Sequence, residues 1–298
     1  MKQFNRLFSV AALVLLAGST LAGGFNFRVV ARGLLRPTGI AARGEGDDKT
    51  IFFTQIPTPG ISGAHGGTNS INALNLENGR IRMIHSGEPE PVSIAYSRGE
   101  LYWTCRTAGV ILKRDRDGEI GPILTDLQKP TGLAVDLYGQ VYFTQLPTPG
   151  VNGAHGGTNT VDVFVNNSVF NLTRGEPEPT SIAVSSDGTV YWTCHTAGVV
   201  LQRTRLGVVS LVAGGLQSPT GIALNDRCDK LYWTEVPTPG MSGSNGGHNM
   251  VKELDLNTNT ISIVHSGDPE PRNITVARDG DIYWTCSSAG VIVEGKPQ

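Results

Sequence analysis

The sequence predicts an all-β fold in which six four-stranded antiparallel sheets form a closed ring. Three observations support this prediction: a high glycine content, a motif that occurs six times, and an aromatic strand after each motif. The chain has 298 residues, of which 38 are glycine, without a triplet period, so tight turns should separate many short strands. Its 39% apolar residues are enough for a folded core. A formal charge of −2 gives no electrostatic footprint for nucleic acid.

The motif occurs in two alternating versions. The first reads Pro-Thr-Gly-Ile-Ala, with Leu for Ile in one copy, and spans residues 37–41, 130–134 and 219–223. The second is more divergent and spans residues 91–95, 179–183 and 271–275. An aromatic strand ending in Thr follows each copy, at residues 51–54, 101–104, 141–144, 190–193, 231–234 and 282–285. Residues 24–298 divided by six give about 46 residues per unit, which fits one blade of a six-bladed β-propeller.

Each unit carries signals for four strands. In the third unit, β-branched and aromatic runs at residues 132–136, 140–144, 160–165 and 169–173 are separated by turns. The last unit ends after its third strand, at residues 290–294, whereas residues 27–34 match the fourth strands that precede units three and five. We therefore expect the N-terminal strand to complete the last blade, which removes an open sheet edge.

The N-terminus has the pattern of a secretory signal. Lys2 and Arg6 precede an apolar run at residues 7–17, and small residues follow at 20–23. The run is shorter than the roughly 20 residues that a bilayer span needs. We therefore expect residues 1–22 to be a signal peptide and residues 23–298 to form one propeller domain without a membrane span. This domain should be secreted or extracytoplasmic.

The recurring pattern Pro-x-x-Ile-Ala…Gly-x-Leu-Tyr-Trp-Thr resembles the NHL and YWTD groups of six-bladed β-propellers. It is more loosely similar to the SMP-30/gluconolactonase and virginiamycin B lyase propellers. The resemblance covers residues 27–294 and implies the fold rather than an activity. The YWTD family would have Asp after Tyr-Trp-Thr, but the residues found here are Cys105, Cys194 and Cys286 in the even units and Gln55, Gln145 and Glu235 in the odd ones.

Two repeated loop sets should crowd one rim. In propellers of the resembled kind, the loops between second and third strands and the loops between blades open on the same side. The first set spans residues 57–69, 147–159 and 237–249, and the second, Gly-Glu/Asp-Pro-Glu-Pro, spans 87–91, 175–179 and 267–271. The candidate binding residues on this rim are Gln55, His65, Asn69, Glu90, Gln145, His155, Asn159, Glu178, Glu235, His248, Asn249 and Glu270.

The rim carboxylates allow two interpretations. With Glu235, they could hold a hard divalent cation such as calcium, and the candidate ligands are then Glu178, Glu235 and Glu270. Alternatively, Arg36 and Lys129 occupy the equivalent position in the odd units, so a ring of alternating charge would pair with itself, although Ser218 breaks the alternation. We favour the second interpretation and predict no firm cofactor.

The histidines and cysteines give no clear metal site. His65 and His155 are replaced by Asn245 in the third loop, so no three-histidine zinc set exists at matching positions. The Gly-Gly-Thr-Asn segments fit a turn, or an anion held by backbone amides. The cysteines of the three Trp-Thr-Cys segments lie on different blades, too far apart for a disulfide, and Cys228 lies on the opposite rim. We expect four free thiols, with the first three as small packing residues.

The repeated loops favour a binding module over an enzyme. The sequence has no nucleophile elbow, zinc-protease motif, phosphate loop or dinucleotide fingerprint. Catalysis generally requires different roles at different positions, whereas these loops are symmetric. We therefore expect a carbohydrate, peptide or protein ligand. The alternative is a metal-dependent hydrolase or lyase, with a divalent ion held by Glu and Asn and with His155 or His195 as the base.

Overall fold

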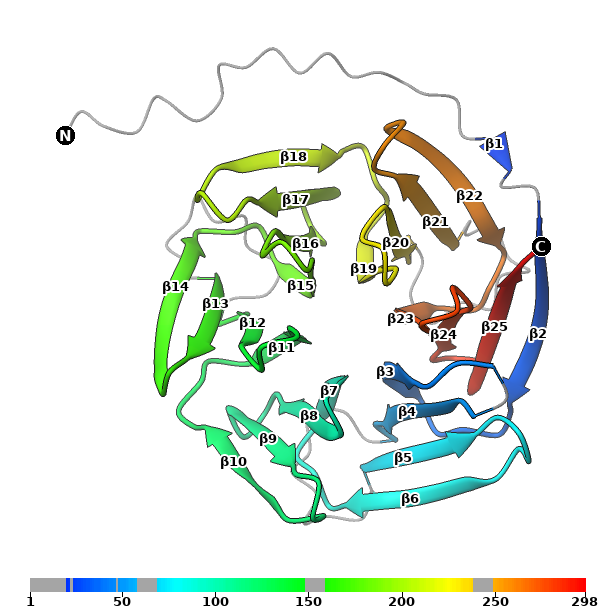
Figure 1. The fold of residues 1–298 in the computed structure, drawn as a ribbon, viewed down its shortest axis with the longest axis horizontal. Coiled ribbons are helices and arrows are strands. Elements are labelled where there is room, and N and C mark those ends of the chain that lie inside the picture. Colours follow the sequence, from blue (N-terminus) through cyan, green and yellow to red (C-terminus); the bar gives the residue numbers. More distant parts are fainter. Residues whose placement is uncertain (1–19, 22–23, 47, 58–68, 148–158, 238–248) are drawn as a thin grey trace.

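The protein is a six-bladed β-propeller, as the repeats predict (Figure 1). The computed structural model describes residues 20–21, 24–46, 48–57, 69–147, 159–237 and 249–298. Six antiparallel sheets stand around a central channel, and within each sheet the strands follow one another from the axis outward. No helix in the described residues is long and apolar enough to cross a membrane.

The blades consist of the following strands. Blade 1 contains β3 (Pro37–Arg43), β4 (Thr50–Gln55), β5 (Ser70–Asn75) and β6 (Ile81–Ser86), and blade 2 contains β7 (Pro91–Ser97), β8 (Glu100–Cys105), β9 (Val110–Arg114) and β10 (Ile120–Leu124). Blade 3 contains β11 (Pro130–Val135), β12 (Val141–Gln145), β13 (Thr160–Val165) and β14 (Ser168–Arg174), and blade 4 contains β15 (Pro179–Val184), β16 (Val190–Cys194), β17 (Val199–Arg203) and β18 (Val209–Ala213). Blade 5 contains β19 (Pro219–Leu224), β20 (Lys230–Glu235), β21 (Met250–Asp255) and β22 (Thr260–Ser266), and blade 6 contains β23 (Pro271–Val276), β24 (Ile282–Cys286), β25 (Val291–Pro297) and β2 (Phe25–Ala31).

The N-terminal strand closes the ring, as predicted. Strand β2 pairs antiparallel with β25, with Val29 opposite Val293, so the two ends of the domain lie in one sheet. The guanidinium of Arg28 donates to Glu294, which is fully buried and also accepts from the Tyr283 hydroxyl at 2.6 Å. The two-residue strand β1 (Thr20–Leu21) lies in the predicted signal peptide and pairs in parallel with β22.

A buried aromatic ring in each second strand forms the core between blades. Each ring lies opposite an Ile or Leu of the innermost strand, as in the pairs Ile40 with Phe53 and Ile222 with Trp233. The six rings have no solvent exposure: Phe53, Trp103, Phe143, Trp192, Trp233 and Trp284. Cross-strand pairs of aromatic and β-branched residues stabilise a sheet, which explains why the Tyr-Trp-Thr and Ile-Ala signals occur together.

The threonine that ends each aromatic strand ties neighbouring blades together. A register shift after the first proline leaves one backbone N–H of each innermost strand unpaired, and this N–H donates to the threonine hydroxyl, as from Gly221 to Thr234 at 2.8 Å. Some of these hydroxyls also donate to the next blade, as from Thr193 in blade 4 to the Thr220 carbonyl in blade 5 at 2.8 Å. The repeated Thr is therefore a structural residue.

Candidate functional site

The two repeated loop sets share one hydrogen-bonded frame on one rim, here called the upper rim. In blades 1, 3 and 5, a fully buried asparagine precedes the third strand. Its side chain donates to the backbone carbonyl of the first acidic residue in the loop that leads to the next blade. The distances are 2.9, 3.1 and 2.9 Å for Asn69, Asn159 and Asn249. Their own carbonyls accept the N–H of the glycine that opens the loop. These candidate residues therefore position the rim from below.

The first acidic residue of each inter-blade loop points into the protein. The Glu176 carboxylate accepts the indole N–H of Trp192 at 3.0 Å, and Asp268 accepts that of Trp284 at 2.7 Å. In the equivalent place, Glu88 lies 3.0 Å from the thiol of Cys105 and 2.9 Å from Nε2 of His85. These three carboxylates are used for packing beneath the rim.

Burial dominates the acidity of the groups in this layer. It raises the pKa of Glu176, against hydrogen bonds from Thr173 and Trp192 that favour the carboxylate. It also raises the pKa of Cys105, Cys194 and Cys286, and a nearby carboxylate adds to the rise. All four cysteines are unpaired, and these three are fully buried. The three thiols therefore fit the predicted packing role.

The second acidic residue of each loop belongs to a ring of six residues at the upper end of the channel. Each member precedes the first proline of an innermost strand and has a left-handed backbone, with φ between 50° and 56°. We call these residues the mouth ring: Arg36, Glu90, Lys129, Glu178, Ser218 and Glu270. The carbonyl of each accepts the N–H of the residue after the second strand, for example His195 onto Glu178 at 3.0 Å.

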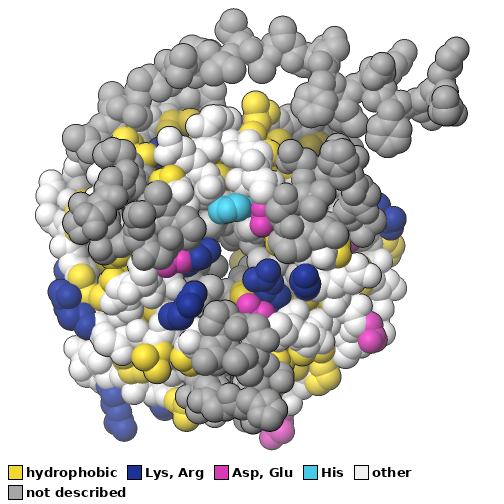
Figure 2. All heavy atoms as spheres, turned by 180° about the vertical axis from the view of Figure 1, so that it is seen from behind, with side chains coloured by type: hydrophobic (Ala, Val, Ile, Leu, Met, Phe, Trp, Pro, Cys, Tyr) yellow, Lys and Arg dark blue, Asp and Glu magenta, His cyan; other side chains and the backbone are white. Residues whose placement is uncertain are grey.

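The charges of the mouth ring do not pair around the ring as expected. Glu270 is bound by Arg272, two positions along the chain, and Glu90 lies 3.7 Å from Arg106. Neither glutamate forms an ion pair with a ring cation in the described part of the chain. Figure 2 shows basic, acidic and histidine side chains gathered around the central opening. Arg36 and Lys129 are exposed and add positive charge to this opening.

The three candidates that end the odd second strands lie below the mouth ring. Gln55, Gln145 and Glu235 each accept the backbone N–H that lies just before the ring residue of their own blade, at 2.5, 2.7 and 3.0 Å. Glu235 has no solvent exposure and also binds Lys252 at 2.8 Å and the indole N–H of Trp233 at 2.9 Å. His65, His155 and His248 lie outside the described residues.

The carboxylates described here do not fit a shared divalent ion. Among the proposed ligands, Glu235 is buried and bound by Lys252, and Glu270 is bound by Arg272, whereas Glu178 forms no ion pair within the described chain. The described residues contain no group of three His, Cys, Asp or Glu side chains that could hold a metal. The arrangement offers cations and hydroxyls to a ligand rather than a set of free carboxylates.

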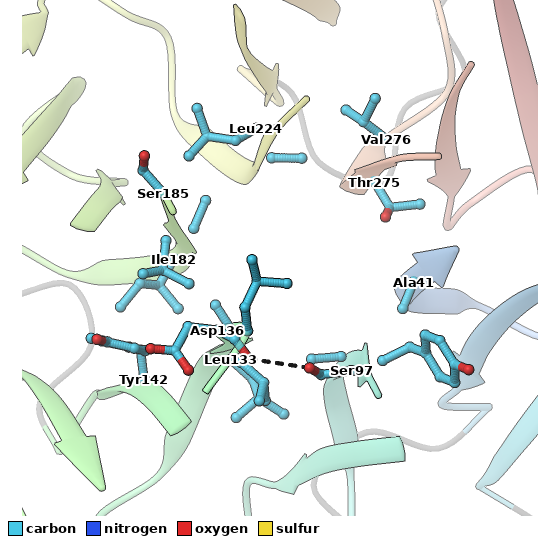
Figure 3. Close-up of a pocket in the computed structure, with 18 of the residues that line it drawn as sticks. Ala41, Ser97, Leu133, Asp136, Tyr142, Ile182, Ser185, Leu224, Thr275 and Val276 are labelled. Atoms are coloured by element: carbon cyan, nitrogen blue, oxygen red, sulfur yellow. Dashed lines mark hydrogen bonds between the residues drawn. The ribbon is translucent and has the colours of Figure 1, made fainter. Parts of the chain in front are cut away.

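Sequence reasoning missed the cavity at the other end of the channel. It has a volume of about 1110 Å³ and is lined by the lower halves of the six innermost strands and the turns that follow them. Figure 3 shows Ala41, Leu133, Ile182, Leu224 and Val276, each from a different blade, arranged around one open space. The sequence signal that could have predicted this cavity is the set of polar residues directly after each Ile-Ala motif.

Comparison with known proteins supports the fold and no single activity. No family model and no curated protein matches the sequence. Among solved structures, the chain is similar to a gluconolactonase from Xanthomonas campestris, with a TM-score of 0.70, 14% identity, and 94% of this chain and 92% of that chain covered. It is similar to virginiamycin B lyase from Staphylococcus aureus, with a TM-score of 0.58, 18% identity, and 92% and 89% covered. It is also similar to a chain of a nidogen/laminin complex, with a TM-score of 0.60, 17% identity, and 80% and 84% covered.

Proposed function

We propose that this six-bladed propeller is an extracytoplasmic binding module whose upper rim takes a carbohydrate, peptide or protein ligand. The ligand contacts the mouth ring and the three pairs of repeated loops that surround it. Solved propellers of similar fold include both enzymes and a member of a nidogen/laminin complex, so the fold is compatible with binding. The N-terminal signal pattern supports a location outside the cytoplasm.

The backbone of the mouth ring is the observation that carries the proposal. A left-handed conformation costs a non-glycine residue roughly 1–2 kcal/mol, and glycine would avoid this cost. The chain nevertheless keeps a side chain at all six ring positions, five of them charged. Such strained positions cluster at functional sites, where they hold side chains in a fixed direction. Glu90 and Glu270 are buried beside Arg106 and Arg272, and we infer that the exposed members Arg36 and Lys129 are retained to contact a ligand.

The charges of the ring favour a ligand with acidic groups. Arg106 and Arg272 offset Glu90 and Glu270, so Arg36 and Lys129 remain as exposed cations beside the channel. The hydroxyls of Thr38 and Thr131 donate to the carbonyls of Arg36 and Lys129. Ser287 and Ser288 line a cavity of about 610 Å³ together with Arg36, Glu270 and Arg272. This combination suits a carboxylated or sulfated glycan, or an acidic peptide.

The experiment is an array of immobilised glycans and peptides probed with the labelled protein. We expect a restricted set of acidic ligands, and about tenfold weaker binding by the double variant Arg36→Gln/Lys129→Gln. Arg80→Gln is the matched control, since Arg80 is an exposed arginine in the hairpin between β5 and β6 on the opposite rim. Equal binding by the double variant and the wild type would contradict the proposal.

One observation favours the competing function, a hydrolase or lyase. Nδ1 of His195 is buried and has no hydrogen-bond partner among the described residues, and its backbone N–H binds the ring residue Glu178. A base at the channel mouth would be placed in this way. A stoichiometric divalent ion after gentle purification, together with loss of turnover in His195→Gln, would support the enzyme. A metal-free protein that binds ligands from the array would support the binding module.

A further inference from the structure

The lower cavity differs from the upper rim in the chemistry of its walls. Its sides are the innermost strands β3, β7, β11, β15, β19 and β23, each of which is the edge strand of its sheet. An edge strand in an antiparallel sheet leaves every second N–H and C=O without a partner in the sheet. The channel therefore offers free backbone donors and acceptors between small apolar side chains such as Ala41 and Val276.

Nine of the described charged residues line this cavity, and none of them neutralises another. Five are basic and four acidic: Arg43, Arg98, Arg203, Arg205, Arg278, Asp48, Asp136, Asp187 and Asp226. In the part of the chain that the structure describes, no ion pair involves any of the nine. The guanidinium groups therefore keep donors for a ligand.

Two of the aspartates are committed to their own turns. Asp136 accepts the backbone N–H groups of Tyr138 and Gln140, both at 2.8 Å. Asp187 accepts the N–H of Thr189 at 2.8 Å and its hydroxyl at 3.1 Å. These bonds, the backbone bond first, lower the pKa of Asp187 against its partial burial, so the group remains a carboxylate within its turn. The carboxylates of both aspartates therefore stabilise their own turns, and we do not assign them to ligand binding.

Three of the arginines line the cavity from three consecutive blades, and Arg98 also donates to the Leu137 carbonyl of blade 3 at 3.5 Å. Arg43 is the last residue of β3 in blade 1, Arg98 follows β7 of blade 2 by one residue, and Arg278 follows β23 of blade 6 by two. These blades are consecutive around the ring, because β23 packs against β3 and β3 against β7. The corresponding turns of blades 3, 4 and 5 carry Asp136, Asp187 and Asp226 instead. The turns after the innermost strands are therefore basic in blades 6, 1 and 2, although Asp48 of blade 1 and Arg203 and Arg205 of blade 4 also line the cavity.

We propose that the lower cavity is a second binding site, for a small molecule that carries a carboxylate or phosphate group. Arg43, Arg98 and Arg278 hold the oxyanion, since guanidinium groups match the geometry of both anions. The free backbone groups of the edge strands bind hydroxyl or carbonyl groups of the rest of the molecule. The cavity volume of about 1110 Å³ slightly exceeds the range of about 300–1,000 Å³ that is usual for small-molecule sites.

The test is isothermal titration of the full chain with citrate, with inorganic phosphate and with the neutral polyol sorbitol, at constant ionic strength. We expect saturable one-to-one binding of at least one anion and none of sorbitol. The double variant Arg43→Gln/Arg278→Gln should weaken this binding about tenfold or more. Both residues are exposed, so folding should be kept, and the melting temperature verifies this. Arg80→Gln, an exposed arginine on the same rim away from the cavity, should bind like the wild type.

The titrations distinguish a carboxylate site, a phosphate site and the absence of a site. Tighter binding of citrate than of phosphate assigns the site to carboxylates, and the reverse assigns it to phosphates. The proposal is wrong if neither anion binds, or if Arg80→Gln weakens binding as much as the double variant does. It is also wrong if the double variant folds and binds with wild-type affinity. None of these results depends on the upper rim, so this proposal and the proposed function fail independently.

Discussion

Replacing Thr193 with valine tests how the blades are held together. The Thr193 hydroxyl accepts the backbone N–H of Ser181 at 3.1 Å in its own blade and donates to the Thr220 carbonyl at 2.8 Å in the next blade. The side chain has no solvent exposure, so water cannot replace either bond. Valine keeps the shape and removes the hydroxyl, which leaves a buried N–H and a buried C=O with one partner fewer.

The expected loss follows from these two bonds. A net hydrogen bond contributes about 0.5–1.5 kcal/mol, and an unsatisfied buried group costs about 1–3 kcal/mol, so Thr193→Val should lose about 2–4 kcal/mol. At about 2–4 °C per kcal/mol for a domain of this size, the melting temperature should fall by about 5–15 °C. Thr193→Ser keeps the hydroxyl and loses one methyl group, which costs about 1 kcal/mol.

The assay compares the urea unfolding of the wild type and the two variants, with refolding checked in each case. Urea midpoints avoid the scan-rate dependence of irreversible thermal unfolding. The hydrogen-bond account predicts that Thr193→Val is clearly less stable than Thr193→Ser. Equal stability of the two variants would show that the hydroxyl contributes no more than the methyl group at this position, which would contradict the hydrogen-bond account.

Three further results are expected. Without reductant, a thiol reagent should label only Cys228 in the native protein and four thiols after unfolding, because the three Trp-Thr-Cys thiols are buried and their pKa is raised. Lys49→Met should lower the free energy of unfolding in urea by about 3 kcal/mol, because Asp279 and Asp281 lose the buried ammonium group that binds them both. A variant as stable as the wild type would contradict a stabilising role of these ion pairs. Burial alone would raise the pKa of Glu294, but the hydrogen bonds from Arg28 and Tyr283 outweigh burial and lower it. The Glu294 carboxylate therefore stabilises the fold fully above its ordinary pKa of 4.5, and this stabilisation is lost as the pH falls through the lowered pKa. In urea unfolding at a series of pH values, Glu294→Gln should lack this acid-dependent loss of stability.

The repeats predict the architecture because they record the geometry of one blade six times. The Pro-x-x-Ile-Ala and Tyr-Trp-Thr signals locate the innermost and second strands, and the missing fourth strand of the last unit predicts the pairing of β2 with β25. The strand begins at Phe25 and ends at Ala31, earlier than the expected residues 27–34. The chain turns at Gly33, which has a positive φ of 71°, and Leu34 then binds the Gly290 carbonyl at 2.9 Å.

The site is less predictable, because sequence position places a residue on a rim but does not give the direction of its side chain. Gln55 and Glu235 end their strands at the rim, yet their side chains bind the linker N–H groups beneath it. The two glutamates of one loop also differ, since Glu88 is buried against Cys105 while Glu90 joins the mouth ring. Their side chains have different partners and only Glu90 has a left-handed backbone, and no composition signal reveals either difference.

The lower cavity was hidden for a different reason. Arg98 and Arg278 each come three residues after the end of their motif and Arg43 comes two residues after its own, but Arg278 is far from Arg43 in the sequence. The blade of Arg278 lies beside the blade of Arg43 only when the ring closes and blade 6 meets blade 1. The adjacent positions of the blades that carry Arg278 and Arg43 therefore follow from closure of the ring and cannot be predicted from any one repeat.

The proposed role of the upper rim is tested most directly by hydrogen exchange measured by mass spectrometry, with and without the tightest ligand from the array. Our account predicts slower exchange in the inter-blade loops at residues 87–90, 175–178 and 267–270 and at the neighbouring mouth-ring positions. The turns at the lower mouth should exchange as before. Slower exchange at the lower turns alone, with the three inter-blade loops unchanged, would contradict the account.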